Sequence, residues 1–172
     1  MTAARRHHVA GGAAVAAVLV LTVGGCGRQQ VPEPTGHITA NGVKVTATLL
    51  SSADGRRELR TTFSPRQRGF HIYSIDLPAH GVDGLGIPTR LAVRGDLTAA
   101  GRPKVNAATR LLRPAGLPTE IPVYPDGPVT FTLPVRQTTS PRHAEVVVSY
   151  GACSENRCLM PVIGEVIPLD LN

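Results

Sequence analysis

The chain has 172 residues, of which 42% are hydrophobic, 3% aromatic and 17% charged. This length suits one domain with short appendages and is sufficient to enclose a hydrophobic core. The 18 glycines and 15 prolines exceed average usage and argue against long helical bundles. The net charge of +6 is spread along the chain and tryptophan is absent, so nucleic-acid binding through clustered basic and stacking side chains is not indicated.

Residues 1–26 have the pattern of a secretory signal peptide. A short basic start with Arg5 and Arg6 precedes an uncharged run rich in alanine, valine and leucine, and then small residues. The last four residues, VGGC, resemble the lipobox of bacterial lipoprotein signal peptides. That resemblance implies cleavage before Cys26 and attachment of a diacylglycerol to its thiol. The alternative is an uncleaved anchor helix in which Cys26 has no role.

A polar segment with Pro32 and Pro34 follows and is predicted to be a flexible tether. About 13 flexible residues span roughly 20 Å, and two acyl chains anchor a protein stably to a bilayer. The predicted organisation is a signal peptide (1–25), a lipidated cysteine with its tether (26–40) and a folded domain (41–172). The sequence therefore predicts a lipoprotein whose domain is held at the outer side of the cell membrane.

The predicted domain reads as strands, because apolar residues recur at every second position rather than at helical spacing. In the first such run, from Val43 to Leu49, the apolar residues fall on one face and the polar residues that alternate with them fall on the other. The predicted strands are Val43–Leu49, Leu59–Phe63, Phe70–Leu77, Thr89–Val93, Val129–Arg136, Ala144–Tyr150 and Glu165–Leu171. Glycine and proline turn signals separate them. Short strands in this number favour an all-β, immunoglobulin-like β-sandwich, with Val146–Val148, apolar on both faces, in a central strand.

Several kinds of site are not indicated. The segment His80–Gly86 has the glycines of a phosphate-binding loop but lacks the following Lys-Ser/Thr, so it is predicted to be a turn. No Gly-x-Ser-x-Gly motif of a hydrolase is present. The histidines are scattered and, with the two C-terminal cysteines, do not have zinc-site spacing. The histidines that follow the predicted signal peptide are His37, His71, His80 and His143. We therefore predict no metal and no cofactor.

The most informative segment is SYGACSENRCLMP, which contains Cys153 and Cys158. In an oxidising compartment these two thiols are expected to form a disulfide across a hairpin neck. A closed loop of about six residues gains only about 2 kcal/mol from such a bond, which makes it a poor staple. Arg157 would favour the thiolate of Cys158, and Glu155 would oppose it. From the residues alone, a redox pair and a structural staple both remain open.

The cysteine segment resembles that of the N-terminal domain of the bacterial thiol:disulfide interchange protein DsbD, where a tyrosine precedes two cysteines four or five residues apart and a proline follows. Further segments match the same domain family in order, over about residues 41–171. These segments are Gly69–Ser74, Gly86–Thr89, Thr119–Tyr124 and Val129–Val135. The resemblance implies an immunoglobulin-like domain that shuttles reducing equivalents outside the cytoplasm. It needs no cofactor, since the dithiol itself carries two electrons.

The resemblance also implies a role for each site residue. Cys153 and Cys158 would form the redox pair, with Cys158 making mixed disulfides and Cys153 resolving them. Tyr73 and Tyr150 match aromatic positions near the pair, although strand packing is an equally good role for both. Electrons would come from a thioredoxin-like partner and pass to oxidised client proteins.

Two departures from the relatives matter. Full-length relatives continue into a membrane domain and a thioredoxin-like domain, whereas this chain ends at Asn172, so we expect the thioredoxin-fold or membrane-embedded donor to act in trans. The aromatic cap loop that shields the relatives' cysteines corresponds here to Leu111–Pro118, which has leucines but no aromatic residue. Two rival interpretations are a non-catalytic binding or assembly lipoprotein with a structural disulfide and a metal-delivery lipoprotein.

Overall fold

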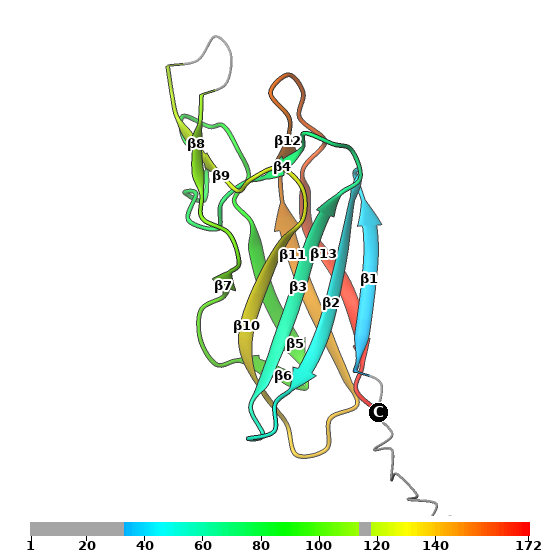
Figure 1. The fold of residues 1–172 in the computed structure, drawn as a ribbon. Coiled ribbons are helices and arrows are strands. Elements are labelled where there is room, and N and C mark those ends of the chain that lie inside the picture. Colours follow the sequence, from blue (N-terminus) through cyan, green and yellow to red (C-terminus); the bar gives the residue numbers. More distant parts are fainter. Residues whose placement is uncertain (1–32, 114–117) are drawn as a thin grey trace, which may run out of the picture. The chain divides into compact units, whose positions relative to one another are not determined.

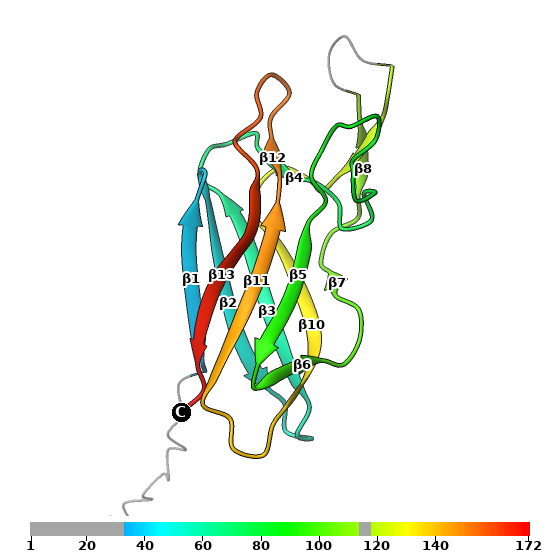
Figure 2. The same ribbon diagram turned by 180° about the vertical axis from the view of Figure 1, so that it is seen from behind.

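Two antiparallel β-sheets packed face to face form the body of the molecule (Figure 1, Figure 2). This computed structural model describes residues 33–113 and 118–172. The predicted signal peptide, Cys26 and the first part of the predicted tether lie outside the described residues. Within those residues, no helix is long and apolar enough to cross a membrane. The prediction of an all-β, immunoglobulin-like sandwich is confirmed.

The larger sheet has the strand order β1-β2-β3-β10-β6, with β7 also paired to β10. Its strands are β1 (Thr35–Ala40), β2 (Val43–Ser51), β3 (Arg57–Pro65), β6 (Leu97–Ala99), β7 (Lys104–Val105) and β10 (Val129–Gln137). Alternation along β2 and β10 buries every second side chain against the second sheet. The long strands of this sheet thus follow the apolar pattern from which they were predicted.

The second sheet has the order β13-β11-β5. Its strands are β5 (Arg90–Gly95), β11 (His143–Tyr150) and β13 (Val162–Asp170). The predicted central position of Val146–Val148 is confirmed, because β11 pairs with β13 on one side and β5 on the other. Two short pairs, β4 (His71–Ile72) with β12 (Ala152–Cys153) and β8 (Arg110–Leu112) with β9 (Ile121–Val123), lie beyond one end of the sandwich (Figure 1).

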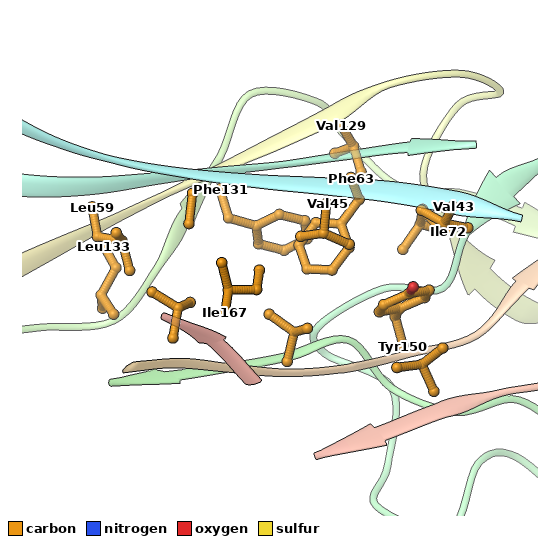
Figure 3. Close-up of a cluster of buried hydrophobic side chains, with 14 of the residues drawn as sticks. Val43, Val45, Leu59, Phe63, Ile72, Val129, Phe131, Leu133, Tyr150 and Ile167 are labelled. Atoms are coloured by element: carbon orange, nitrogen blue, oxygen red, sulfur yellow. The ribbon is translucent and has the colours of Figure 1, made fainter. Parts of the chain in front are cut away.

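Aromatic rings form the centre of the core between the sheets. Phe63 of β3 contacts Phe131 of β10 and Tyr150 of β11 edge to face, with ring centroids 5.2 and 5.3 Å apart. Figure 3 shows these rings between the two sheets, with Ile167 of β13 beside them. Edge-to-face pairs of this kind add about 0.5–1.5 kcal/mol each beyond the burial of their area. The core therefore ties β11, which leads to the two cysteines, firmly to the larger sheet.

The N-terminal boundary of the domain differs from the prediction. Residues 35–40, assigned to the tether from the sequence, form β1 and pair with β2 from Thr35 opposite Thr48 onward. The connecting turn is Asn41-Gly42, and both residues have positive φ (45° and 79°), as a two-residue hairpin turn requires. The sequence did not predict β1 because its composition is polar. An edge strand that is only half buried does not need apolar residues at every second position.

The predicted strand Phe70–Leu77 is strand only at His71–Ile72. Beyond Ile72 the backbone bonds to separate segments: Tyr73 N–H donates to Gly151 O and Ser74 N–H to Pro122 O. Of its buried apolar side chains, Ile72 packs in the sandwich core, whereas Tyr73 and Leu77 belong to a second apolar cluster. The segment therefore connects the core to the loops at the end of the sandwich.

A methyl group added at Gly36 tests whether β1 packs against β13. The added Cβ would overlap the carbonyl oxygen of Pro168 and lie 2.8 Å from Cγ2 of Ile167. We expect Gly36→Ala to lower the free energy of unfolding by about 1–3 kcal/mol, the usual cost of overpacking, measured by urea denaturation. Gly101→Ala is the matched control, because its Cβ would approach Pro134 only to 3.6 Å. Equal stability of the two variants would contradict this packing.

Candidate functional site

A disulfide between Cys153 and Cys158 closes the neck of the loop that joins β12 to β13. The sulfurs are 2.08 Å apart and the Cα atoms 4.0 Å apart. Within the loop, Ser154 N–H donates to Arg157 O at 2.7 Å, and the Ser154 hydroxyl accepts bonds from backbone N–H groups. The pairing is the one expected from the sequence, and the loop has hydrogen bonds of its own.

The two cysteines differ in burial. Cys153, at the end of β12, is 3% exposed and packs with Tyr73, Ile121 and Val123 in the second apolar cluster. Cys158 is exposed. Of this pair, an incoming thiolate can therefore approach Cys158, whereas Cys153 is covered.

Tyr73 lies beside the buried sulfur. Its hydroxyl oxygen is 2.9 Å from Sγ of Cys153 and 3.8 Å from Sγ of Cys158. A disulfide sulfur carries no hydrogen, so the hydroxyl is the donor. Tyr73 is only 7% exposed, and burial raises the pKa of its hydroxyl, which therefore keeps its proton at neutral pH. The same O–H can donate to a Cys153 thiolate.

Gly151 makes room for the Tyr73 ring, because a Cβ there would lie 2.7 Å from Cδ2 of Tyr73. A Cβ on Gly86 would lie 2.9 Å from Cδ2 of Leu77 and at an ordinary contact distance, 3.4 Å, from Cε1 of Tyr73. The Thr89 hydroxyl donates to the Tyr73 carbonyl oxygen at 2.6 Å and fixes the backbone. Sequence reasoning missed these roles, although all three residues lie in segments that resemble the DsbD domain. The roles of these residues depend on where the Tyr73 ring lies in space, which cannot be predicted from the sequence of these segments.

An apolar groove of about 280 Å³ runs beside the disulfide. Leu85 to Ile87 of the Gly-rich segment contribute one side of the groove, and Leu159 and Pro161 belong to its lining with both cysteines. The segment His80–Gly86 is a turn, as predicted, with Val82 and Leu85 bonded to each other. It brings apolar side chains, rather than a phosphate-binding loop, to the site.

Of the predicted cap segment Leu111–Pro118, Leu111 and Leu112 lie in β8. Residues 114–117 are outside the described residues. Leu111 is 63% exposed, whereas Leu112 packs against the apolar cluster that contains Cys153. One leucine of this segment therefore packs against the cluster to which the buried cysteine belongs.

Of the other predicted near-site residues, Tyr150 belongs to the core. Its hydroxyl donates to Ala40 O at 3.1 Å, and burial raises its pKa to about 12. The strand-packing role that the sequence left open for Tyr150 is the one its contacts support. The guanidinium of Arg157 stacks over the Phe70 ring, 5.4 Å from its centroid, and donates to Gln67.

His71 is a site residue that sequence reasoning did not identify. It is fully buried, is the register partner of Cys153 in the β4–β12 pair, and its ring meets that of Tyr73 edge to face. Nδ1 lies 3.3 Å from Oδ1 of Asp126, which also accepts a bond from Arg110. Nε2 is buried without a partner. Among the described residues, no group of three or more His, Cys, Asp or Glu side chains could hold a metal ion.

Solved structures that are similar to this chain include two N-terminal domains. The N-terminal periplasmic domain of ScsB from Proteus mirabilis is 18% identical with a TM-score of 0.54, and the match covers 80% of this chain and 51% of that chain. The chain shares the fold of this domain. The N-terminal domain of DsbD from Neisseria meningitidis, in the reduced form, is 13% identical with a TM-score of 0.43, and the match covers 81% of this chain and 82% of that chain.

The chain spans about half the length of the ScsB chain that it matches. No protein-family model matches the chain, and no curated protein matches it. The resemblance to the DsbD N-terminal domain family drawn from the cysteine segment is confirmed as a likeness of fold.

A Gly151→Ala variant tests the position of the Tyr73 ring. The new methyl group would lie 2.7 Å from the ring, so either the ring or β12 must move. We expect the free energy of unfolding to fall by about 1–3 kcal/mol, measured by urea denaturation of the oxidised protein. Gly101→Ala again serves as the control. If the Gly151 variant were as stable as this control, the ring would not occupy the described space.

The pKa of His71 predicts a pH dependence of stability. Burial is the largest cause that lowers this pKa below 6.5, so the folded protein keeps the ring neutral where the unfolded chain binds a proton. The contribution of His71 to the free energy of unfolding should therefore be complete above pH 6.5. It should decline as the pH falls from there toward the lowered pKa. Urea denaturation between about pH 5 and 8 should show a shallower decline for His71→Asn than for the exposed control His143→Asn. Parallel curves would refute the assignment.

Proposed function

We propose that this protein performs thiol–disulfide exchange outside the cytoplasm, passing reducing equivalents from a thioredoxin-fold or membrane-embedded donor to oxidised client proteins. The observation that carries the proposal is the asymmetry of the disulfide. Cys158 is exposed to an incoming sulfur, whereas Cys153 is buried with a hydroxyl donor 2.9 Å from its sulfur. A structural staple needs neither an accessible sulfur nor a donor that stabilises a thiolate.

Reduction begins when a donor thiolate attacks Sγ of Cys158. A bond forms between the donor sulfur and Cys158, the Cys153–Cys158 bond breaks, and Cys153 leaves as a thiolate. The Tyr73 O–H donates to this thiolate, and a hydrogen bond to a charged group contributes about 1.5–3 kcal/mol. A leaving thiol with a lower pKa also leaves faster. Attack by the second donor thiolate then releases an oxidised donor and a reduced Cys153–Cys158 pair.

Delivery to a client runs in the opposite sense. The Cys158 thiolate attacks the client disulfide and forms a mixed disulfide, and one client sulfur leaves. Cys153 then attacks Cys158, which restores the intramolecular disulfide and releases the second client sulfur. Two electrons pass from the pair to the client, and no cofactor takes part. The apolar groove beside the cysteines offers a surface for the polypeptide that carries the partner sulfur.

The location belongs to the same proposal. Cleavage before Cys26 and lipidation of its thiol would tether the domain to the membrane. Since β1 begins at Thr35, the tether from Cys26 is shorter than the sequence suggested, about eight residues or roughly 15 Å. The similar ScsB domain is periplasmic, which supports an extracytoplasmic site of action. A short tether would keep Cys158 near a membrane-embedded donor.

Trapping in the full-length protein tests the function. We expect Cys153→Ala, expressed in cells and isolated from membranes, to carry a mixed disulfide through Cys158 with a thioredoxin-fold protein. Cys158→Ala is the matched control and should trap far less, because Cys153 is buried. The wild-type disulfide should have a reduction potential above about −300 mV. A lower potential together with no adduct would instead support a binding or assembly lipoprotein with a structural disulfide.

A further inference from the structure

The buried ring of His71 has one nitrogen that the fold leaves without a partner. Nδ1 faces the Asp126 carboxylate, which can only accept a hydrogen bond, so Nδ1 carries the ring proton. Burial lowers the pKa of His71, so the ring is neutral at neutral pH. Nε2 then carries no hydrogen and can only accept a hydrogen bond, and it is buried with no hydrogen-bond donor. Such an acceptor is costly to keep unless another state of the protein uses it.

The missing donor is available one strand away. His71 and Cys153 are register partners in the β4–β12 pair, and side chains of directly opposite residues lie on the same face with Cβ atoms about 4.5–5.5 Å apart. Cys153 is as deeply buried as the ring. In the disulfide its sulfur carries no hydrogen, but in the reduced protein it carries an S–H group. Reduction therefore supplies a buried S–H donor on the residue directly opposite His71 in the strand pair.

We propose that Nε2 of His71 accepts the proton of the Cys153 thiol when this cysteine resolves a mixed disulfide. The inference rests on the thiol–disulfide exchange proposed above and assigns one further residue to it. Because a thiol buried in apolar surroundings ionises reluctantly, a nearby base is what this step requires. Asp126 holds the ring in the tautomer with a free Nε2, as a carboxylate orients a histidine base.

Before this step Cys158 is joined to a client sulfur, and Cys153 is a thiol. The Cys153 proton moves to Nε2, the Cys153 sulfur bonds to Sγ of Cys158, and the bond from Cys158 to the client breaks. The pair is oxidised by two electrons, and the client leaves as a thiolate that takes a proton from His71 or from solvent. Tyr73 keeps its own proton throughout and acts as a hydrogen-bond donor to the Cys153 sulfur.

The charges around His71 suit a base that is neutral at rest. After burial, which lowers its pKa most, the hydrogen bond to Asp126 raises it. The positive charge of Arg110 lowers the pKa, and the negative charges of Asp126 and Glu155 raise it. Arg110 lies 3.0 Å from the same Asp126 oxygen that faces Nδ1, so its positive charge partly offsets that of the carboxylate. Protonation of the ring is therefore disfavoured at rest and assisted by two carboxylates when the thiol proton arrives.

A two-phase reaction with 5,5′-dithiobis(2-nitrobenzoate) tests the inference. One equivalent added to the dithiol-reduced full-length protein should release a first thionitrobenzoate as Cys158 is labelled and a second as Cys153 displaces the label. His71→Asn retains an amide donor for Asp126 but has no second ring nitrogen. We expect it to leave the first phase unchanged and to slow the second about tenfold or more at pH 7, since general bases contribute factors of about 10²–10⁴. His143→Asn should leave both phases unchanged.

The pH profile separates a base from a merely structural residue. In the wild type the second phase should level off once His71 is neutral, above about pH 6.5. In His71→Asn it should continue to rise with pH, because only ionisation of the thiol then supplies the nucleophile. A second phase of wild-type rate and profile in His71→Asn would overturn the inference and leave the exchange function intact. Loss of the first phase in the wild type would count against the exchange function itself.

Asp126→Asn provides a second, milder variant. Asp126 is only half buried, so the substitution spares the core, but it removes the carboxylate that fixes the ring tautomer. We expect it to slow the second phase severalfold with the first phase unchanged. If His71→Asn does not fold, as judged by urea denaturation of the oxidised protein, Asp126→Asn decides the question, and an unchanged second phase in it would overturn the inference.

Discussion

The hydrogen bond from the Tyr73 hydroxyl to Sγ of Cys153 joins residues 80 positions apart, and the rest of the site is arranged around it. The bond needs Tyr73 to turn away from the sandwich after the two residues of β4, and it needs β12 to lie directly beside that turn. Gly151 leaves space for the ring, and Thr89 holds its backbone. The chemistry of the disulfide therefore depends on packing contributed by three separate segments of the chain.

The sandwich explains why these segments meet where they do. Loops at the end of a rigid β-sandwich can carry functional residues at little cost to the core. Here β11 is central in its sheet, and its last residue, Tyr150, is locked by Phe63 and by the bond to Ala40 O. The cysteine loop begins three residues later and so starts from one of the most firmly held points of the molecule. Tyr150 thus supports the site from the core, although it does not contact a sulfur.

Sequence patterns predicted the long strands well because burial on one face imposes a period of two, and β2, β10 and β11 show that period clearly. They did not predict β1. The sequence evidence for this strand was the Asn41-Gly42 dipeptide, which is typical of a two-residue hairpin turn. The strands of two or three residues are too short to show a period. The cysteine pairing could be predicted from spacing, but the burial of Cys153 and the contacts of Tyr73 and His71 could not. These depend on which loops meet in space, and a single sequence contains no record of that.

The energetics of the loop bear on whether the disulfide can open and close without unfolding the domain. By chain entropy a loop this short gains only about 2 kcal/mol from its disulfide. The same neck is already held by the bond from Ser154 N–H to Arg157 O and by that from Leu159 N–H to Ala152 O. Because Cys153 also remains packed in the second apolar cluster through Ile121 and Val123, little of the fold depends on the S–S bond itself. Reduction can then change the chemistry of the two sulfurs while β12 and the groove beside it stay in place.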